Sequence, residues 1–160
     1  MGCSSSAAVV EISAEHRERI NAIINFWFPA GWDRNTKATP EAIKTWFVNK
    51  PEDDANVQRR FQADYDSAVA GRYKSWESDP QGLLALIIIL DQFSRQLFRK
   101  QAKAFAADPQ ALKLSQKAVA NEASWKNYAL FERYFLIMPM MHAEDPVVTG
   151  ACVQQFIKLD

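Results

Sequence analysis

The chain has 160 residues, 48% of them apolar and 12% aromatic, and nineteen Lys and Arg balance nineteen Asp and Glu. This length suits one domain with a sizeable core, and the composition excludes disorder for the bulk of the chain. The zero net charge argues against a dedicated nucleic-acid binder, so we expect no nucleic-acid partner. No apolar run reaches the roughly 18–20 residues of a membrane span, and no secretory signal is present, so we expect a cytoplasmic protein.

The first six residues, Met-Gly-Cys-Ser-Ser-Ser, match the N-myristoylation pattern, in which Gly2 is acylated after Met1 is removed. Cys3, directly after the glycine, is suited to added palmitate. One myristoyl chain binds membranes only marginally, whereas two acyl chains anchor stably. We therefore expect residues 1–12 to form a flexible tail that tethers the protein to a membrane surface through Gly2 and Cys3. The alternative is a tail that is never acylated, as in a bacterial chain.

Residues 13–160 are predicted to form a single helical domain. Pairs of a good N-cap residue and a proline predict four helix starts, at Thr39-Pro40, Asp79-Pro80, Asp108-Pro109 and Asp145-Pro146. Apolar residues at three-four spacing predict helices over 13–28, 51–70, 109–121, 123–138 and 146–158. Gly71 suits a helix C-cap, and Pro139 is expected to kink or end its helix. The fold class is thus all-α, with six to seven antiparallel helices stacked as a tetratricopeptide-repeat-like array or bundle.

The most informative stretch is Leu83–Arg99, predicted as one helix that begins fully apolar and then turns polar. A helix that is apolar all round is buried all round, so this stretch is expected to run through the core. Asp91, Arg95 and Arg99 recur every four residues and predict a polar stripe beside packed neighbours. The stripe is either an intrahelical ion pair or a ligand site. Arg95 and Arg99, with Lys100 and Lys103, could bind phosphate or carboxylate, or could form a solvated basic helix end.

A second polar cluster, His142 and Glu144, falls between Pro139 and the predicted cap at Asp145. A histidine at a helix junction can act as an acid or base, contact a ligand, or cap free carbonyls, and capping is the more common role. Asp91, His142 and Glu144 would form a metal site only if the fold brought both segments together, and we expect no metal and no cofactor. Cys3 and Cys152 are the only cysteines, so neither a disulfide framework nor structural zinc is expected.

The segments Leu90-Asp91-Gln92-Phe93-Ser94-Arg95 and His142-Ala143-Glu144-Asp145 resemble motifs of the family catalogued as domain of unknown function 924. The family's Phe-Trp-Phe, Trp-Phe, Phe-Ala-x-Asp and Pro-x-x-His-x-Glu motifs correspond to residues 26–28, 46–47, 105–108 and 139–144. The resemblance covers roughly residues 20–155. It implies a tetratricopeptide-repeat-like fold and a polar pocket that includes Asp91, Gln92, Arg95, Arg99, His142 and Glu144, but it implies no reaction.

Two departures from the family pattern stand out. Ser94 replaces a usual proline, which is expected to relax a local helix kink. Family members usually continue into a Gly-Arg-Phe-Pro-x-Arg-Asn-like segment, which these 160 residues do not contain. If that segment completes the pocket, the resemblance implies a lost activity and an exposed apolar end of the array.

Two hypotheses of function follow. The first is a binding or scaffolding module, tethered to a membrane surface, whose polar pocket takes a protein, a peptide or a small anionic ligand. The alternative is an enzyme that positions a small anionic substrate with Arg95 and Arg99 and transfers protons with His142 or Asp91. The two differ in one structural requirement, because the enzyme needs His142 close to Asp91 beside a cleft.

Overall fold

The computed structural model describes residues 11–47 and 50–158, which form helices and connecting turns without a strand. The prediction of an all-α fold is therefore confirmed. Seven helices are eight residues or longer, and the predicted stacking as a repeat array stays a prediction. The longer helices are α1 (Ala14–Trp27), α2 (Pro40–Phe47), α3 (Pro51–Val69), α4 (Pro80–Ile87), α6 (Asp108–Ala120), α8 (Leu130–His142) and α9 (Pro146–Ile157).

Shorter elements connect them. They are η1 (Lys74–Ser78), η2 (Ile88–Phe93), α5 (Ser94–Leu97), η3 (Ala102–Phe105) and α7 (Glu122–Trp125). None of the described helices is both long enough and apolar enough to cross a membrane.

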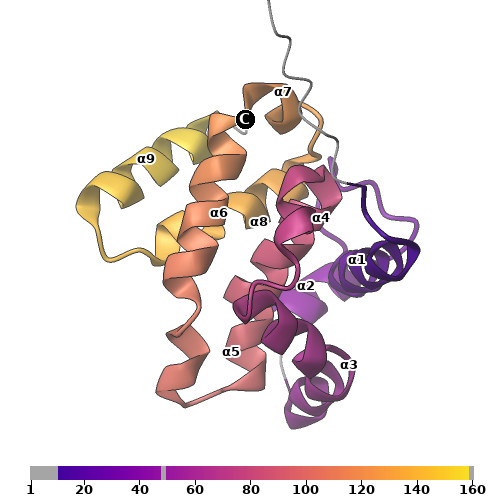
Figure 1. Cartoon of the computed structure of the whole chain (residues 1–160). Helices are drawn as coiled ribbons and strands as arrows, with labels where there is room; N and C mark the ends of the chain where they lie inside the picture. The colour runs from indigo at the N-terminus through magenta and orange to yellow at the C-terminus, as the bar shows by residue number, and fades with distance from the viewer. Residues whose placement is uncertain (1–10, 48–49, 159–160) are drawn as a thin grey trace, which may run out of the picture.

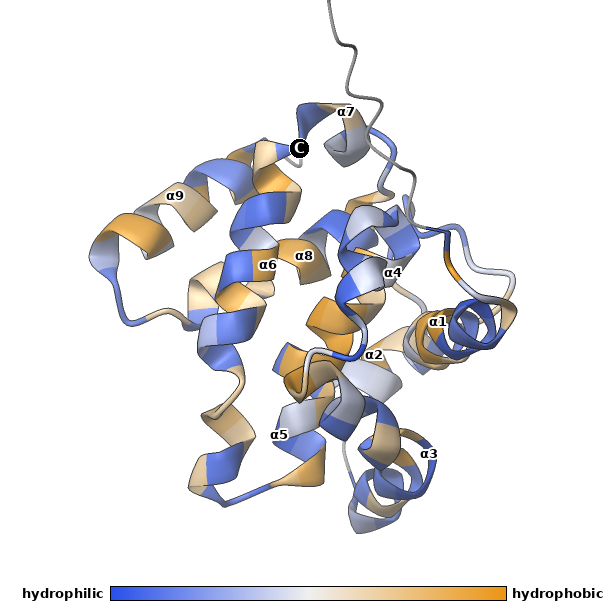
Figure 2. Ribbon diagram, viewed as in Figure 1, coloured by the Kyte–Doolittle hydropathy of each residue, from blue (hydrophilic) through white to orange (hydrophobic). Residues whose placement is uncertain are grey.

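The apolar run that opens Leu83–Arg99 occupies the centre of the molecule. Every residue from Gly82 to Asp91 is buried. In Figure 1, α4 and α5 run between α1 and α3 on one side and α6, α8 and α9 on the other. The contacts agree, since α1, α6 and α8 all pack on α4 while α3 packs on η2. Figure 2 shows apolar residues gathered on the inward sides of these helices. The expected buried course of this stretch is confirmed.

An aromatic cluster fills the space between α1, α2 and α8. Trp27, Phe28 and Trp46 are buried, as the core interpretation of these residues predicts. The Trp46 ring lies 4.9 Å from the Phe135 ring in an edge-on arrangement, a favoured geometry for aromatic pairs. The Trp46 indole also donates to the Trp27 carbonyl, over 2.9 Å, which satisfies its buried N–H. The cluster fixes α8, which carries His142 at its end.

The predicted helix over Leu83–Arg99 is interrupted. After α4 the chain makes one π-helical segment, η2, and α5 then ends at Leu97. Arg99 thus lies outside the helix, and Lys100 follows with a positive φ of 62°. The four-residue stripe therefore breaks after Arg95. Periodicity could not reveal this, because a single π turn leaves the apolar pattern almost unchanged.

The helix predicted over 123–138 is wrong. Instead α7 and α8 are separate helices with a turn between them. Tyr128 in that turn is buried, and its hydroxyl donates to the Pro80 carbonyl over 2.9 Å, which pins the turn against α4. Pro139 does not end α8, which continues to His142. Because Pro139 is buried within α8, packing of α8 against α6 and α9 holds the helix through the missing hydrogen bond.

Three of the four predicted N-caps are confirmed. The Asp79 carboxylate accepts from the Gly82 N–H at 2.7 Å, and Thr39 and Asp145 cap α2 and α9 in the same way. The fourth prediction is wrong: the N-cap of α6 is Ala107, and Asp108 is the first helical residue. Its carboxylate binds the Arg95 guanidinium instead, because a bidentate, charge-assisted pair is stronger than one backbone hydrogen bond.

Candidate functional site

Four of the six predicted site residues meet at one place. Asp91 and Gln92 come from η2, Arg95 from α5 and His142 from the end of α8. Glu144 lies in the turn after α8, at the edge of the same pocket. Arg99 is not part of this group. Its guanidinium binds Asp54 of α3, with Nη2 and Oδ1 2.7 Å apart, and so ties the end of α5 to the start of α3.

Asp91 is completely buried and is the anchor of the site. Its Oδ1 lies 2.8 Å from Nδ1 of His142, and its Oδ2 accepts from the Gln92 side chain at 2.6 Å. The Arg95 guanidinium approaches the same carboxylate to 3.5 Å, so the predicted intrahelical ion pair is present. A buried carboxylate is tolerated only when it is paired and hydrogen-bonded, and these three partners meet that requirement.

Arg95 is fully engaged by the protein. Its two terminal nitrogens donate to the two carboxylate oxygens of Asp108, over 3.1 and 3.0 Å, and Nη1 also donates to the Asp91 carbonyl. Its guanidinium lies 5.3 Å from the centre of the Phe105 ring. With its charge compensated by two carboxylates, Arg95 has little capacity left for an anionic ligand. Its hydrogen bonds instead join α5 to the start of α6.

The hydrogen-bond geometry fixes the orientation of the His142 ring. Nδ1 lies near both Asp91 Oδ1 and Arg95 Nη2, at 2.8 and 3.1 Å. A carboxylate can only accept, so Nδ1 carries the proton and donates it to Asp91. The neutral ring then has its lone pair on Nε2, for which the described residues supply no partner. The expectation that His142 caps free carbonyls is wrong, because the buried Asp91 binds it instead.

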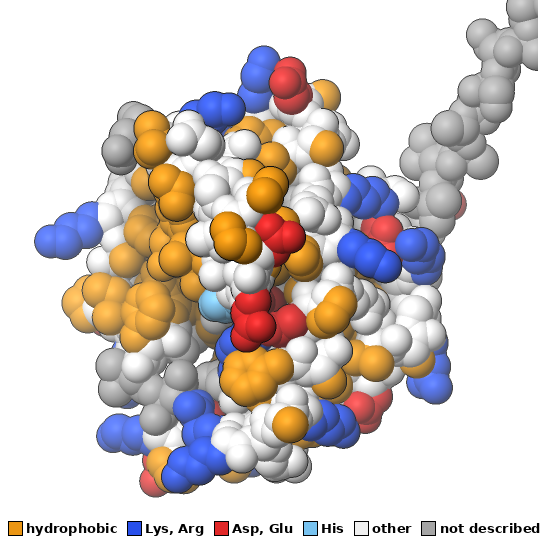
Figure 3. Space-filling view, turned by 90° about the vertical axis from the view of Figure 1, so that its left-hand side faces the viewer, with side chains coloured by type: hydrophobic (Ala, Val, Ile, Leu, Met, Phe, Trp, Pro, Cys, Tyr) orange, Lys and Arg blue, Asp and Glu red, His pale blue; other side chains and the backbone are white. Residues whose placement is uncertain are grey.

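A pocket of about 950 Å³ opens beside this group, between α6 and the junction of α8 and α9. Arg95, Asp108, His142 and Glu144 line it together with apolar side chains from three elements. The apolar lining comes from Phe105, Pro109, Leu112, Pro139, Ala143 and Pro146. Figure 3 shows the α6–α9 side of the molecule, where acidic side chains lie beside a broad apolar area. We call this the His142 pocket.

The His142 pocket is acidic. Its lining contributes three carboxylates, Asp108, Glu144 and Asp145, against the single guanidinium of Arg95, and Asp91 adds a fourth carboxylate behind it. Among residues 11–47 and 50–158, no group of three or more His, Cys, Asp or Glu side chains is arranged to hold a metal ion. The pocket therefore combines an apolar wall, an excess of negative charge and one oriented imidazole.

Sequence reasoning missed Asp108 and Phe105 as site residues. Asp108 was assigned to the helix cap because Asp-Pro is a strong helix-start signal, and that signal does not report what the carboxylate binds. Phe105 lies only three residues earlier but is 58% exposed, over the Arg95 guanidinium. The available signal was the Phe-Ala-x-Asp motif at residues 105–108, which places both residues at the start of one helix.

The family of the chain follows from comparison with known sequences. A profile of the family described as "Bacterial protein of unknown function (DUF924)" matches residues 23–160. The chain belongs to this family. All six predicted pocket residues fall inside the matched range, whereas Gly2 and Cys3 precede it and lie outside the described residues. No curated protein matches the chain.

A solved structure supports the same family fold. The chain resembles the protein of unknown function ATU0120 from Agrobacterium tumefaciens, with 26% sequence identity and a TM-score of 0.77. The match covers 90% of this chain and 75% of that one. The family and this neighbour are both described as being of unknown function, so neither assigns a ligand or reaction to the His142 pocket.

Proposed function

We propose that this member of the DUF924 family is a ligand-binding protein whose His142 pocket takes a small molecule with an apolar body and a cationic or hydrogen-bond-donating end. The observation that carries the proposal is the completely buried Asp91 behind His142. A buried carboxylate that orients an imidazole at the wall of a pocket pre-organises a polar contact for a ligand. The π turn that holds Asp91 adds support, since such turns are frequent at functional sites.

The charge of the pocket sets the class of ligand. Glu144 and Asp145 exceed the compensation that Arg95 gives to Asp108. An anion would meet unpaired carboxylates, whereas an ammonium group would be attracted to them. The apolar wall of Leu112 and Pro139 suits an aromatic or aliphatic body. The Nε2 lone pair of His142 would accept a hydrogen bond from the donor end of the ligand.

Benzylamine and benzoate provide a matched pair of probes, because they share a ring and differ in charge. We expect benzylamine to shift the amide resonances of Leu112, His142 and Glu144 saturably in an NMR titration of the full chain. Benzoate is expected to bind more weakly at the same ionic strength. Equal or tighter binding of benzoate would refute the proposed ligand class.

Two acidic residues allow a controlled test by substitution. Glu144→Gln is expected to weaken benzylamine binding about fivefold, the effect of one partly screened charge contact. Glu122→Gln changes the net charge equally but lies in α7, outside the pocket lining, and should leave the affinity unchanged. Equal losses in both variants would mean that the amine responds to the overall charge and not to the pocket.

A second candidate function is acid–base catalysis on such a ligand, favoured by the proximity of Asp91 and His142 beside a pocket. In this arrangement Asp91 is a positioning residue, and Nε2 of His142 is the group placed to accept a proton. Arg99 has no part in it, because it binds Asp54. Hydrogen–deuterium exchange at acidic C–H positions of bound amines tests the idea. The exchange should disappear in His142→Gln, and its absence from the parent chain would remove catalysis of this type.

Membrane tethering is a separate proposal that rests on the sequence Met1–Ser6 alone. If Gly2 and Cys3 are acylated, the protein should sediment with membranes of its own cell, and Gly2→Ala should move it to the supernatant. Cys3→Ala should give a weaker, reversible association, because one acyl chain binds only marginally. Membrane association of Gly2→Ala equal to that of the parent chain would contradict the proposal.

A further inference from the structure

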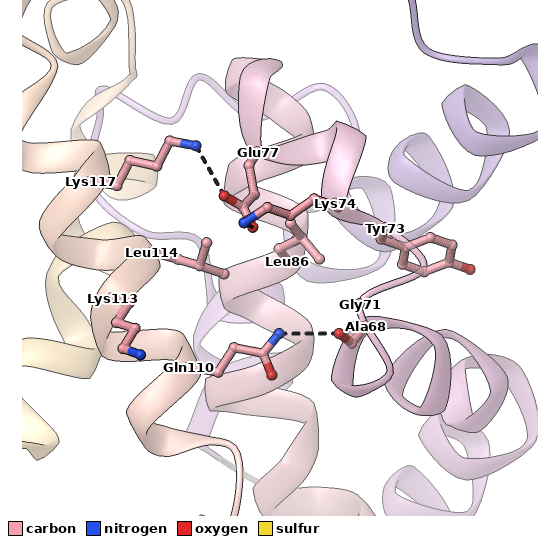
Figure 4. A pocket seen from close by; sticks show the side chains of 10 residues that line it. All are labelled: Ala68, Gly71, Tyr73, Lys74, Glu77, Leu86, Gln110, Lys113, Leu114 and Lys117. Carbon is pink, nitrogen blue, oxygen red and sulfur yellow. Dashed lines mark hydrogen bonds and ion pairs between the residues drawn. The ribbon is translucent and has the colours of Figure 1, made fainter. Parts of the chain in front are cut away.

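A second pocket lies on the other side of α6 from the His142 pocket. It has a volume of about 320 Å³ and is enclosed by the end of α3, by η1, α4 and α6. Figure 4 shows its side chains, with Lys74 and Glu77 coming from η1 and Lys113 and Lys117 from α6. We call it the lysine pocket. Helical periodicity explains the arrangement, since 109 and 112 face one pocket while 113 and 117 face the other.

The lysine pocket already holds one carboxylate. Glu77 Oε1 lies 2.9 Å from the Lys74 ammonium, and Oε2 lies 3.0 Å from that of Lys117. The Glu77 side chain is only 15% exposed, while those of Lys74 and Lys117 are 79% and 51% exposed. Burial acts to raise the pKa of Glu77, but hydrogen bonds from Lys74 and Lys117 outweigh it and lower that pKa. Glu77 is thus held in its charged form.

The cations of the pocket exceed its carboxylates. Lys113 also lines it and forms no ion pair within the described part of the chain. Three lysines and one glutamate give the lining a formal charge of about +2 near neutral pH. Leu86 and Leu114 add an apolar surface beside these charges. A compact dianion with a small organic group matches both the charge and the lining.

We propose that the lysine pocket binds a small phosphate monoester, with Lys113 and Lys117 as its principal cationic contacts. Glu77 competes with the ligand for Lys117 and Lys74, so the empty pocket is held together by an internal carboxylate. Arrival of the phosphate redistributes the lysines, and Glu77 limits the affinity. The site is independent of the His142 pocket and of any function proposed for it.

Titration of the ¹⁵N-labelled full chain with inorganic phosphate and with glycerol phosphate tests this site at constant ionic strength. We expect saturable shifts at the amides of Lys74, Glu77, Lys113 and Lys117, and weaker shifts with acetate. Co-sedimentation with vesicles that contain phosphatidic acid distinguishes a lipid phosphate from a soluble one. Binding of a soluble or a lipid phosphate at these residues supports the proposal, and binding of neither refutes it.

Substitutions separate a built site from diffuse attraction. Lys113→Gln with Lys117→Gln should weaken phosphate binding about tenfold. Lys44→Gln with Lys126→Gln removes the same charge from α2 and from the turn after α7 and should leave binding within about twofold. Equal weakening by the two double variants would refute the site. Melting curves of each variant establish that the fold is retained.

Glu77→Gln gives the sharpest test, because it predicts a gain. Removing the competing carboxylate should tighten phosphate binding about threefold to tenfold. Loss of binding in this variant, or no change, would overturn the proposed competition between Glu77 and the ligand.

Discussion

The two pockets beside α6 show opposite ways of placing charge in a helical protein. At the His142 pocket the central charge is buried: Asp91 is enclosed, and Arg95 is shared between two carboxylates. At the lysine pocket the central carboxylate is Glu77, and the cations that hold it are largely exposed. Buried charges must satisfy each other for the chain to fold, whereas exposed lysines can exchange partners at little cost. The first arrangement is expected to be rigid and the second adaptable.

The largest effect is expected at Asp91. Asp91→Asn keeps the shape of the side chain but removes the charge that His142 and Arg95 share. We expect a loss of about 3 kcal/mol in the free energy of unfolding, the usual effect of breaking a buried pair, measured by urea denaturation. Lys117→Gln at the lysine pocket should cost less than about 1 kcal/mol. An unchanged midpoint for Asp91→Asn would indicate a carboxylate placed for a ligand and not for the fold.

The next effect concerns the wall of the lysine pocket, which depends on close packing between η1 and α4. A Cβ on Gly82 would lie 2.6 Å from the Trp76 carbonyl oxygen, which is too close for any real contact. Gly82→Ala is therefore expected to destabilise the protein by about 2 kcal/mol, as overpacking does, and to shift the amide resonances of Glu77.

Gly150→Ala in α9 is the matched control for that prediction. A Cβ there has no neighbour within 4 Å, so alanine should be neutral or should stabilise the helix by up to about 1 kcal/mol. Equal effects of the two substitutions would mean that η1 can shift freely and that the lysine pocket has no fixed wall.

The smallest effect is a dependence on acid. Glu77 has a lowered pKa, so it stabilises the fold fully above its unfolded value of 4.5, and this contribution is lost as the pH falls through the folded value. We expect the unfolding free energy to decrease below about pH 5. The decrease should be shallower in Glu77→Gln, as measured by denaturant titration at several pH values. Identical slopes in the two proteins would mean that the lysines do not hold the carboxylate.

Part of this organisation could be predicted from the sequence. The apolar run in Leu83–Arg99 predicts a buried central helix, and Thr39, Asp79 and Asp145 predict their caps, because both signals are local. Asp91 and His142 are 51 positions apart, and their contact depends on how α8 packs. The family motifs grouped them, but only the structure shows which atoms meet.

The errors share a cause. Arg99 and Asp108 were assigned from local spacing, yet each carboxylate or guanidinium takes the best partner in space, Asp54 for one and Arg95 for the other. The lysine pocket carries no local signal at all, since its lysines come from two elements separated in the chain. Ion pairing is a tertiary property, and periodicity alone cannot assign it.

The π segment η2 acts as a phase adjuster within the central helix. It inserts one residue's worth of rotation between the apolar α4 and the polar α5. Without that insertion, every later side chain would turn by about 100° around the axis. Arg95 would then no longer face Asp108, and α6 would lose its tie to α5. A single-residue deletion between Ile88 and Phe93 would thus leave the hydrophobic pattern acceptable while uncoupling the core from the polar site built on it.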